Sequence, residues 1–429
     1  MRRSRPFHSH VPTAKALTLA TTALLLAACA GSDEGLSVTA FEGARVIPGD
    51  GSAPVEDAVL LVENGRFIAV GARSSVDIPR GATRVDLTGK TVMPAIVNTH
   101  MHLASTRPER AAQLEHMAYY GAGVVVSLGT DSGMVAFEMR GETRPGTPRT
   151  QTAGRGITSP EPGRTTVPFW VTTEAEARTA VQELAAERVD FVKIWVDDRN
   201  GQYEKLPEPV YAAVIDEAHR HGLRVTAHIF ALEDAKSLLR AGIDAFAHGI
   251  RDQDIDDELV ALWKERPDVV LVPNMPDPGV AQDYAWLSGT VPREEVARMQ
   301  EGSTDRPEAQ ETFGIQARNL ARLSREGIRV AFGTDGSVAW SPHLEMEDMV
   351  RSGMSPAQVI TAATGSSAAF LRMDDLGTVA VGKSADFLVL DADPLDDITA
   401  TRRIASVYLA GAEVDRVGIS ARLTGMPAR

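Results

Sequence analysis

Residues 97–102 read Val97-Asn98-Thr99-His100-Met101-His102. On a β-strand, two residues that are two positions apart point to the same face, whereas on a helix they diverge. The apolar residues in front of the histidines indicate a buried strand. We therefore expect the imidazoles of His100 and His102 to reach the same metal ion from one strand.

Four further residues of metal-binding type stand in or after short apolar runs. Lys193, His228, His248 and Asp335 accompany runs that are rich in Val, Ile, Phe and Ala. A single histidine after such a run is usually a buried structural residue. Six residues in similar positions along their runs instead indicate one site that is assembled from separate strands.

Stretches of helical character lie between the apolar runs. Alternating strands and helices predict parallel βα units with right-handed crossovers. Eight such strands predict an α/β fold, the (β/α)8 TIM-type barrel, whose functional side chains lie at the C-terminal ends of its strands. The strands are predicted around Val97 and at 124–128, 155–158, 192–196, 225–229, 245–250, 269–273 and 330–333, and the helices include 173–187, 209–221, 232–241 and 316–327.

The motifs around these residues resemble those of the amidohydrolase superfamily of metal-dependent hydrolases. The resemblance extends over nearly the whole chain after the leader and is strongest to the prolidase-like and imidazolonepropionase-like branch. It rests on Gly89-Lys90-Thr91-Val92-Met93-Pro94 leading into His100-Met101-His102, on Val192-Lys193-Ile194, His228, His248-Gly249 and Gly333-Thr334-Asp335-Gly336, and on Gly382-Lys383-Ser384-Ala385-Asp386-Phe387-Leu388-Val389-Leu390.

The resemblance implies a binuclear site for two divalent metal ions, with zinc as the expected metal. A free lysine ammonium has a pKa of about 10.4 and cannot bind a cation, so Lys193 is expected as a carbamate formed with CO2. The implied arrangement has the first ion held by His100, His102 and Asp335, the second ion held by His228 and His248, and Lys193 and a hydroxide bridging the two.

The resemblance also implies the reaction. Zinc lowers the pKa of its bound water to about 7, so a metal-bridging hydroxide can attack an amide carbonyl at neutral pH. Asp335 is expected to take the proton and pass it to the leaving nitrogen. Lys193 takes part as the bridging ligand, and Tyr203, in the loop after the Lys193 strand, is a candidate to polarise the carbonyl.

Two long segments, 129–172 and 273–306, are predicted as loops over the site. The first is rich in arginine, and Arg140, Arg144 and Arg149 are candidates to bind a substrate carboxylate through two parallel hydrogen bonds. The alternative is that they are ordinary surface residues. A carboxylate-binding cluster favours a dipeptide or an N-acyl amino acid as the substrate.

Two more side chains are candidates for the pocket wall. Trp195 comes two residues after Lys193 and shares its face of the strand, so its ring either walls the pocket or packs in the core. His343 follows the last predicted strand in a loop and is the other candidate for substrate binding.

The predicted function is that of a metal-dependent amidohydrolase that cleaves a C–N bond in a dipeptide, an N-acyl amino acid or an aryl amide. A mononuclear deaminase or cyclic-imide hydrolase is an alternative, although Ala231 stands where such deaminases carry Glu. A lactonase, esterase or phosphotriesterase could use the same site. A lipoprotein without enzymatic activity would be expected to have lost metal ligands, and none is lost.

The two ends of the chain predict further parts. Segments 36–93 and 374–416 alternate polar and apolar residues, include the hairpin signal Asn64-Gly65, and are expected to pair into one small β-sandwich domain. Arginines followed by an apolar stretch that ends in Leu26-Ala27-Ala28-Cys29 predict a bacterial lipoprotein leader. The predicted boundaries are signal peptide 1–28, tether 29–35, β-sandwich 36–93 and 374–416, barrel 94–373 and tail 417–429.

Cys29 is the only cysteine, so no intrachain disulfide can form. Its position predicts lipid attachment and an exported lipoprotein of the cell envelope. The formal net charge of −14 argues against nucleic acid as a partner and leaves the lipid as the only predicted membrane contact. The expected partner is a small-molecule amide or peptide, and a homo-oligomer is left open.

Overall fold

The computed structural model describes residues 38–142 and 144–425. The predicted leader and tether, with Cys29, lie outside these residues, as does the end of the predicted tail. Within the described part of the chain, no helix is both long enough and apolar enough to cross a membrane.

One mixed sheet is built from both chain ends. Its order is β17-β16-β15-β5-β1-β2-β3, and β4 pairs with β1. Antiparallel pairing of β15 with β5 joins segments that lie almost three hundred residues apart. The strands are β1 (Thr39–Val46), β2 (Val55–Glu63), β3 (Arg66–Ala72), β4 (Thr83–Asp86), β5 (Thr91–Pro94), β15 (Phe387–Leu390), β16 (Ile404–Leu409) and β17 (Ala412–Glu413).

The hairpin between β2 and β3 turns at Asn64-Gly65, as predicted. Both residues have positive φ, 50° and 73°, which is the conformation of a tight hairpin turn that favours Asn-Gly. The two predicted segments thus meet in one eight-stranded sheet. A division of this sheet into the two layers of a sandwich stays a prediction.

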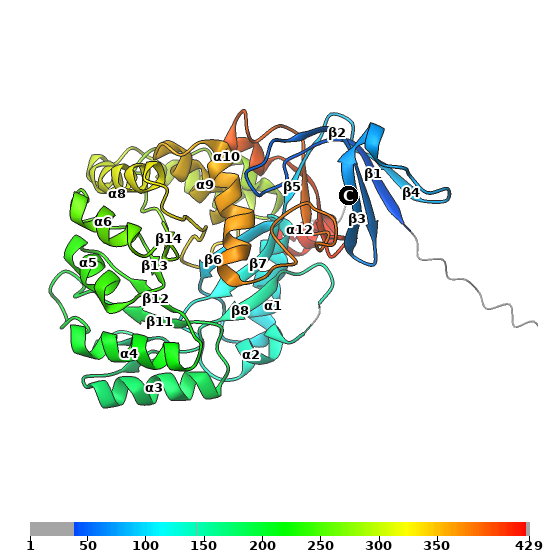
Figure 1. The fold of residues 1–429 in the computed structure, drawn as a ribbon. Coiled ribbons are helices and arrows are strands. Elements are labelled where there is room, and N and C mark those ends of the chain that lie inside the picture. The colour runs from blue at the N-terminus through cyan, green and yellow to red at the C-terminus, as the bar shows by residue number, and fades with distance from the viewer. Residues whose placement is uncertain (1–37, 143, 426–429) are drawn as a thin grey trace, which may run out of the picture. The chain divides into compact units, whose positions relative to one another are not determined.

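The remaining strands are parallel and fall into two sheets, β6-β7-β8 and β10-β9-β11-β12-β13-β14 (Figure 1). Helices α3 to α6 lie outside strands β11 to β14 in Figure 1. This is an α/β fold of the TIM-barrel type, although its ladders do not run continuously round a closed barrel. The strands are β6 (Ile96–Met101), β7 (Ala122–Ser127), β8 (Arg149–Thr152), β9 (Ile157–Thr158), β10 (Phe169–Trp170), β11 (Val192–Trp195), β12 (Val225–His228), β13 (Ala245–Ala247) and β14 (Val270–Val272).

The predicted eighth strand lies between β14 and β6 without forming a regular ladder. Ala331 N–H donates to the carbonyl of Leu271, and Thr99 N–H donates to the carbonyl of Phe332, at 2.9 and 2.8 Å. Buried apolar residues of β6, β7, β13, β14 and this segment share one cluster. Segment 330–333 therefore connects the two sheets at the place where a barrel strand is expected.

The predicted third strand begins earlier than the sequence suggested. β8 pairs with β7 from Arg149 onward, and the chain then reaches β11 through Ile157. Gly156 stands between the two pairings and lies against Trp195, because a Cβ there would be 2.1 Å from the Trp195 ring. The sequence predicts the stretch 149–152 as part of the loop 129–172, which is rich in Pro, Gly and Thr.

The helices agree with the predicted alternation, and some extend further. The predicted helix 316–327 overlaps the longer α8, which begins earlier and ends two residues sooner, and the predicted loops contain β8, β9, β10, α2 and α7. The helices are α1 (Arg107–Tyr119), α2 (Val135–Arg140), α3 (Glu174–Ala186), α4 (Glu208–Arg220), α5 (Leu232–Ala241), α6 (Asp257–Lys264), α7 (Arg293–Gly302), α8 (Pro307–Arg325), α9 (Ser341–Arg351), α10 (Pro356–Thr361), α11 (Ser367–Leu371) and α12 (Arg416–Thr424).

Candidate metal centre

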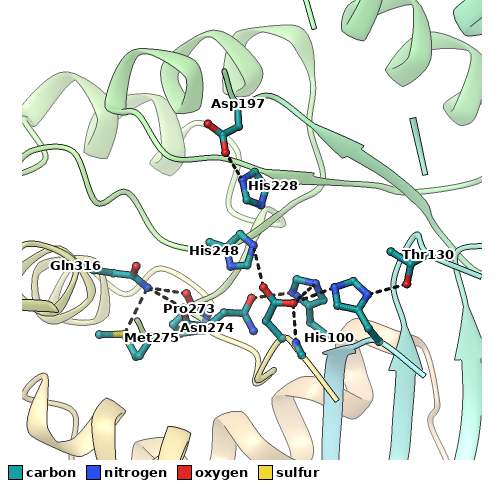
Figure 2. Close-up of polar contacts among 12 residues, drawn as sticks. His100, Thr130, Asp197, His228, His248, Pro273, Asn274, Met275 and Gln316 are labelled. Atoms are coloured by element: carbon teal, nitrogen blue, oxygen red, sulfur yellow. Dashed lines mark hydrogen bonds and ion pairs between the residues drawn. The ribbon is translucent and has the colours of Figure 1, made fainter. Parts of the chain in front are cut away.

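Two histidines stand at the C-terminal end of β6. His100 Nδ1 donates to Asn274 Oδ1 over 2.9 Å, and His102 Nδ1 lies 3.0 Å from Thr130 Oγ1 in a hydrogen bond (Figure 2). With Nδ1 engaged in this way, the Nε2 of each ring is directed to the carboxylate of Asp335. The two rings thus share one target, as their spacing predicts.

Asp335 is the centre of the cluster. Its Oδ1 lies 2.9 Å from His102 Nε2 and 3.7 Å from His100 Nε2, and its Oδ2 lies 3.4 Å from His248 Nε2. The potential ligand atoms of His100, His248 and Asp335 all lie within 4.8 Å of one another. Asp335 has a φ of 57°, so a non-glycine residue takes a left-handed conformation here, as is common at functional sites.

His228 lies beside this group, at the end of β12. Its ring centroid is 4.6 Å from that of His248. Its Nε2 is engaged with Asp197 Oδ2 at 2.9 Å (Figure 2). The same nitrogen lies 3.0 Å from Arg199 Nη1. His228 is therefore adjacent to the three-residue cluster and has a charged environment of its own.

The surroundings set the charges of these groups. Burial lowers the pKa of His228 to about 4 and holds the pKa of both His100 and His248 well below its usual value. Burial alone would raise the pKa of Asp335, but the neighbouring histidines outweigh it and hold that pKa well below its usual range. Neutral imidazoles and an ionised carboxylate are the forms that bind metal ions.

Lys193 is fully buried on β11, and its Nζ has no hydrogen-bond partner among the described residues. Burial lowers its pKa to about 7, while the carboxylate of Asp335 acts in the opposite direction. A Cβ on Gly129 would lie 2.7 Å from the Lys193 side chain, so glycine leaves room for it. The amine thus lies close enough to the histidine cluster to act on His100 electrostatically, and it has no hydrogen-bond partner among the described residues.

Comparison with known proteins places this site in a family. The amidohydrolase family model matches residues 167–414. The chain belongs to the amidohydrolase family.

Relatives place this amidohydrolase in the prolidase-like and imidazolonepropionase-like branch. The imidazolonepropionase of Deinococcus radiodurans is 28% identical over 387 residues, which cover 84% of this chain and 92% of the relative. A candidate prolidase from Bifidobacterium longum has a solved structure with a TM-score of 0.73 and 28% identity, covering 89% and 95% of the two chains. The fold is also similar to that of a Xaa-Pro dipeptidase, with a TM-score of 0.71, 21% identity and coverage of 88% and 99%. The protein is a hydrolase that acts on C–N bonds.

Three residues that hydrogen-bond to the candidate ligands of this amidohydrolase were missed in the sequence. Asp197 stands four residues after Lys193, so the period of two along a strand could have indicated it. Asn274 directly follows the predicted strand 269–273, so its position at a strand end could have indicated it. Thr130 offered no such signal, because a single threonine in a segment rich in Pro, Gly and Thr has no pattern.

The structure does not bring Arg140, Arg144 and Arg149, the predicted substrate-binding arginines, to the candidate metal centre. Arg149 is the first residue of β8, at the opposite end of the strand, and pairs with Asp386. Arg140 pairs with Asp190, just before β11 begins, at 2.8 Å. Together with Arg144, these arginines line a separate cavity of about 360 Å³.

The other pocket candidates have different outcomes. His343 is buried on α9 with both ring nitrogens engaged, to Thr401 Oγ1 at 3.1 Å and to the Tyr120 carbonyl at 3.2 Å, so it is a structural residue and not a pocket residue. Trp195 lies beside Lys193 as predicted, with Nζ 5.5 Å from the ring centroid. The hydroxyl of Tyr203 donates to the carbonyl of Pro162 over 3.0 Å, and its catalytic role stays a prediction.

Proposed function

We propose that this amidohydrolase cleaves the C–N bond of a dipeptide, an N-acyl amino acid or an aryl amide with the help of two divalent metal ions. The observation behind this proposal is the convergence of three imidazoles on the carboxylate of Asp335, next to a buried lysine amine without a partner. Among the described residues, Lys193 Nζ has no hydrogen-bond partner that would offset the cost of its burial.

The donor set fits zinc. Imidazole nitrogens and carboxylate oxygens are common zinc ligands, and Asn274 and Thr130 supply the outer hydrogen bonds that orient His100 and His102. Because the pKa of Lys193 is lowered to about 7, its neutral amine can attack CO2, form an N–C bond and release one proton. The resulting carbamate would be an anionic ligand. His100, His102 and Asp335 would hold one ion, and His228 and His248 the other.

The reaction needs few groups from the chain. When bound, the metal ions would polarise the substrate carbonyl and lower the pKa of water. Asp335 is placed to accept the proton of the attacking water and to return it to the leaving nitrogen. The burial of Lys193 and the adjacent Trp195 ring restrict the access of bulk water to this side of the centre.

Metal content decides between one ion and two. We would purify the protein with bicarbonate and measure zinc per chain by elemental mass spectrometry, beside the Lys193→Ala variant. Two ions in the parent and fewer in the variant are expected. One ion in both would remove Lys193 from the centre and favour deaminase or cyclic-imide chemistry.

A substrate panel tests the reaction itself. Dipeptides, N-acyl amino acids and aryl amides would be compared with esters, lactones, phosphotriesters, cyclic imides and aminated heterocycles. Turnover of the first group is expected, and turnover of the others alone would contradict the proposed substrate class.

We also propose that the enzyme is an exported lipoprotein of the cell envelope, attached through Cys29. The sole cysteine follows Leu26-Ala27-Ala28 after an apolar stretch, which supports this proposal. Labelling of cells with radioactive palmitate should mark the parent protein. The same label on a Cys29→Ser variant would contradict the proposal.

A further inference from the structure

Arg251 has an unusual environment, three residues after His248. Its backbone N–H donates to the carbonyl of Phe230 over 3.0 Å, which links the chain after β13 to the chain after β12. Its Nε and Nη2 are buried and have no hydrogen-bond partner among the described residues. The guanidinium therefore lies near the C-terminal ends of two strands that supply candidate metal ligands.

An unpaired buried guanidinium requires an explanation. Arginine stays charged in proteins, and N–H groups removed from water without a partner cost free energy. Nε and Nη2 lie on the same edge of the guanidinium. This edge can donate two parallel hydrogen bonds to one carboxylate.

Three carboxylates act electrostatically on Arg251, and each of them already has another partner. Asp335, Asp197 and Glu345 act on Arg251 through space and oppose the lowering of its pKa by burial. Asp335 faces the histidines, and Asp197 is bonded to His228. Both oxygens of Glu345 accept from the Met275 N–H, at 3.0 Å each. None of them pairs with the free edge of Arg251.

We infer that the Nε–Nη2 edge of Arg251 binds the free carboxylate of the substrate. This inference rests on the proposed function and narrows it to N-acyl amino acids and dipeptides with an unblocked C-terminus. Phe230, whose side chain is 36% exposed, offers an apolar surface on the neighbouring strand end. The favoured residue next to the scissile bond is accordingly an apolar one.

The test compares two substrates that differ only in the carboxylate, N-acetyl-L-phenylalanine and N-acetyl-2-phenylethylamine. The parent enzyme should prefer the first. Arg251→Met should reduce this preference, measured as the ratio of the two kcat/KM values, by about 10- to 100-fold, as expected for the loss of two charge-assisted hydrogen bonds. Most of the loss on N-acetyl-L-phenylalanine should appear in KM.

Two further variants serve as controls. Arg251→Lys retains the charge without the two-donor edge and should restore only part of the preference. Arg144→Met removes an arginine from the cavity at the other end of β8 and should leave the preference unchanged. Zinc content and thermal unfolding of each variant show whether the centre and the fold are intact.

The outcomes separate the two levels of the proposal. Hydrolysis of both substrates with a preference that Arg251→Met and Arg251→Lys leave unchanged would overturn the role of Arg251 alone. If Arg144→Met lost the preference instead, the carboxylate would bind at the arginine cluster. That result would also overturn the role of Arg251. If no amide in the panel is hydrolysed by the zinc-loaded parent, the proposed function itself fails.

Discussion

The two ends of the parallel strands differ in how their charged groups are paired. At the N-terminal ends, Arg149 pairs with Asp386, Arg140 pairs with Asp190, and Asp244 accepts from His219 and from a backbone N–H, whereas the unpartnered atoms there, in the part of the chain that the structure describes, are the neutral Thr150 Oγ1 and Gln151 Oε1 of β8. At the C-terminal ends, several buried atoms have no partner among the described residues. These atoms include Lys193 Nζ, His248 Nδ1, Arg251 Nε and Nη2, Asn274 Nδ2 and Gln316 Oε1.

The difference separates polar groups that are paired within the fold from polar groups that are left for a ligand. Paired charges join elements that are distant in sequence, such as β8 and the segment before β15, and they need nothing from outside. A buried donor or acceptor without a partner costs about 1–3 kcal/mol, so a concentration of such groups lowers stability unless a ligand completes it. We therefore expect substitutions at the C-terminal end to affect binding and catalysis, and those at the N-terminal end to affect stability.

The largest expected effect is that of Asp335→Asn. The substitution removes the proton acceptor and the carboxylate on which three histidines converge, so kcat/KM should fall by about 10²- to 10⁴-fold, and zinc content should fall with it. Steady-state kinetics on the best substrate of the panel, with elemental analysis, measures both. Asp244→Asn, the same change at the other end, should lower the melting temperature and keep the zinc. If Asp335→Asn kept its activity within tenfold of the parent, the proposed contrast between the two ends of the strands would be contradicted.

The second effect concerns the orientation of a ligand. Asn274→Ala removes the acceptor of His100 Nδ1, so zinc affinity should decrease by about 10- to 100-fold. Competition with a fluorescent chelator measures the affinity. Asn319→Ala is the matched control, because the Asn319 side chain bonds to backbone groups alone among the residues that the structure describes, those of Ile250, Gln253 and Ile255. Equal zinc affinity in the two variants would show that Asn274 has no orienting role.

The candidate metal ligands could be predicted from the sequence because strand geometry determines their positions locally. His100 and His102 are on one face by period two, and each later ligand follows its own apolar run. The third strand could not be predicted in the same way. Arg149 at its start is polar because it pairs with Asp386, 237 positions later, and no local pattern contains that partner.

The position of the arginines shows a second limit of local patterns. Arg140, Arg144 and Arg149 form a visible cluster in the sequence, yet the structure places them away from the metal centre. Arg251 is a single arginine in the sequence and resembles any surface residue. Only its burial and the absence of a partner for its Nε–Nη2 edge distinguish it, and both depend on how β12 and β13 end side by side.

The third prediction tests the structural end. Arg149→Met leaves the carboxylate of Asp386, whose side chain is 5% exposed, without its cation. The free energy of unfolding should fall by about 1–3 kcal/mol, toward the lower value because the Arg149 side chain is 37% exposed. Urea unfolding measures this change, and kcat/KM should stay at the parent value. Adding Asp386→Asn to the same chain should recover part of the loss, and a drop in kcat/KM instead would assign this end a functional role.

The smallest effect concerns the pH dependence of stability near the site. Asp348 lines a cavity of about 420 Å³ together with Met275, Thr334 and Glu345, and burial raises the pKa of Asp348 to about 7. Because this pKa is higher in the folded than in the unfolded chain, the folded state binds the extra proton between about pH 4 and pH 7. The stability that this proton contributes is present below pH 4 and is lost as the pH rises to 7.

Asp348→Asn removes this titration, so its free energy of unfolding should change less between pH 4 and pH 7 than that of the parent. The difference in slope should be about 1 kcal/mol per pH unit or less, because one titrating group contributes at most about 1.4 kcal/mol per unit. Urea unfolding at several pH values measures the slope. Asp374→Asn, at an exposed carboxylate, is the control. A slope in Asp348→Asn equal to that of the parent would show that the buried carboxylate imposes no cost, and the functional end would then differ from the structural end in ligand binding alone.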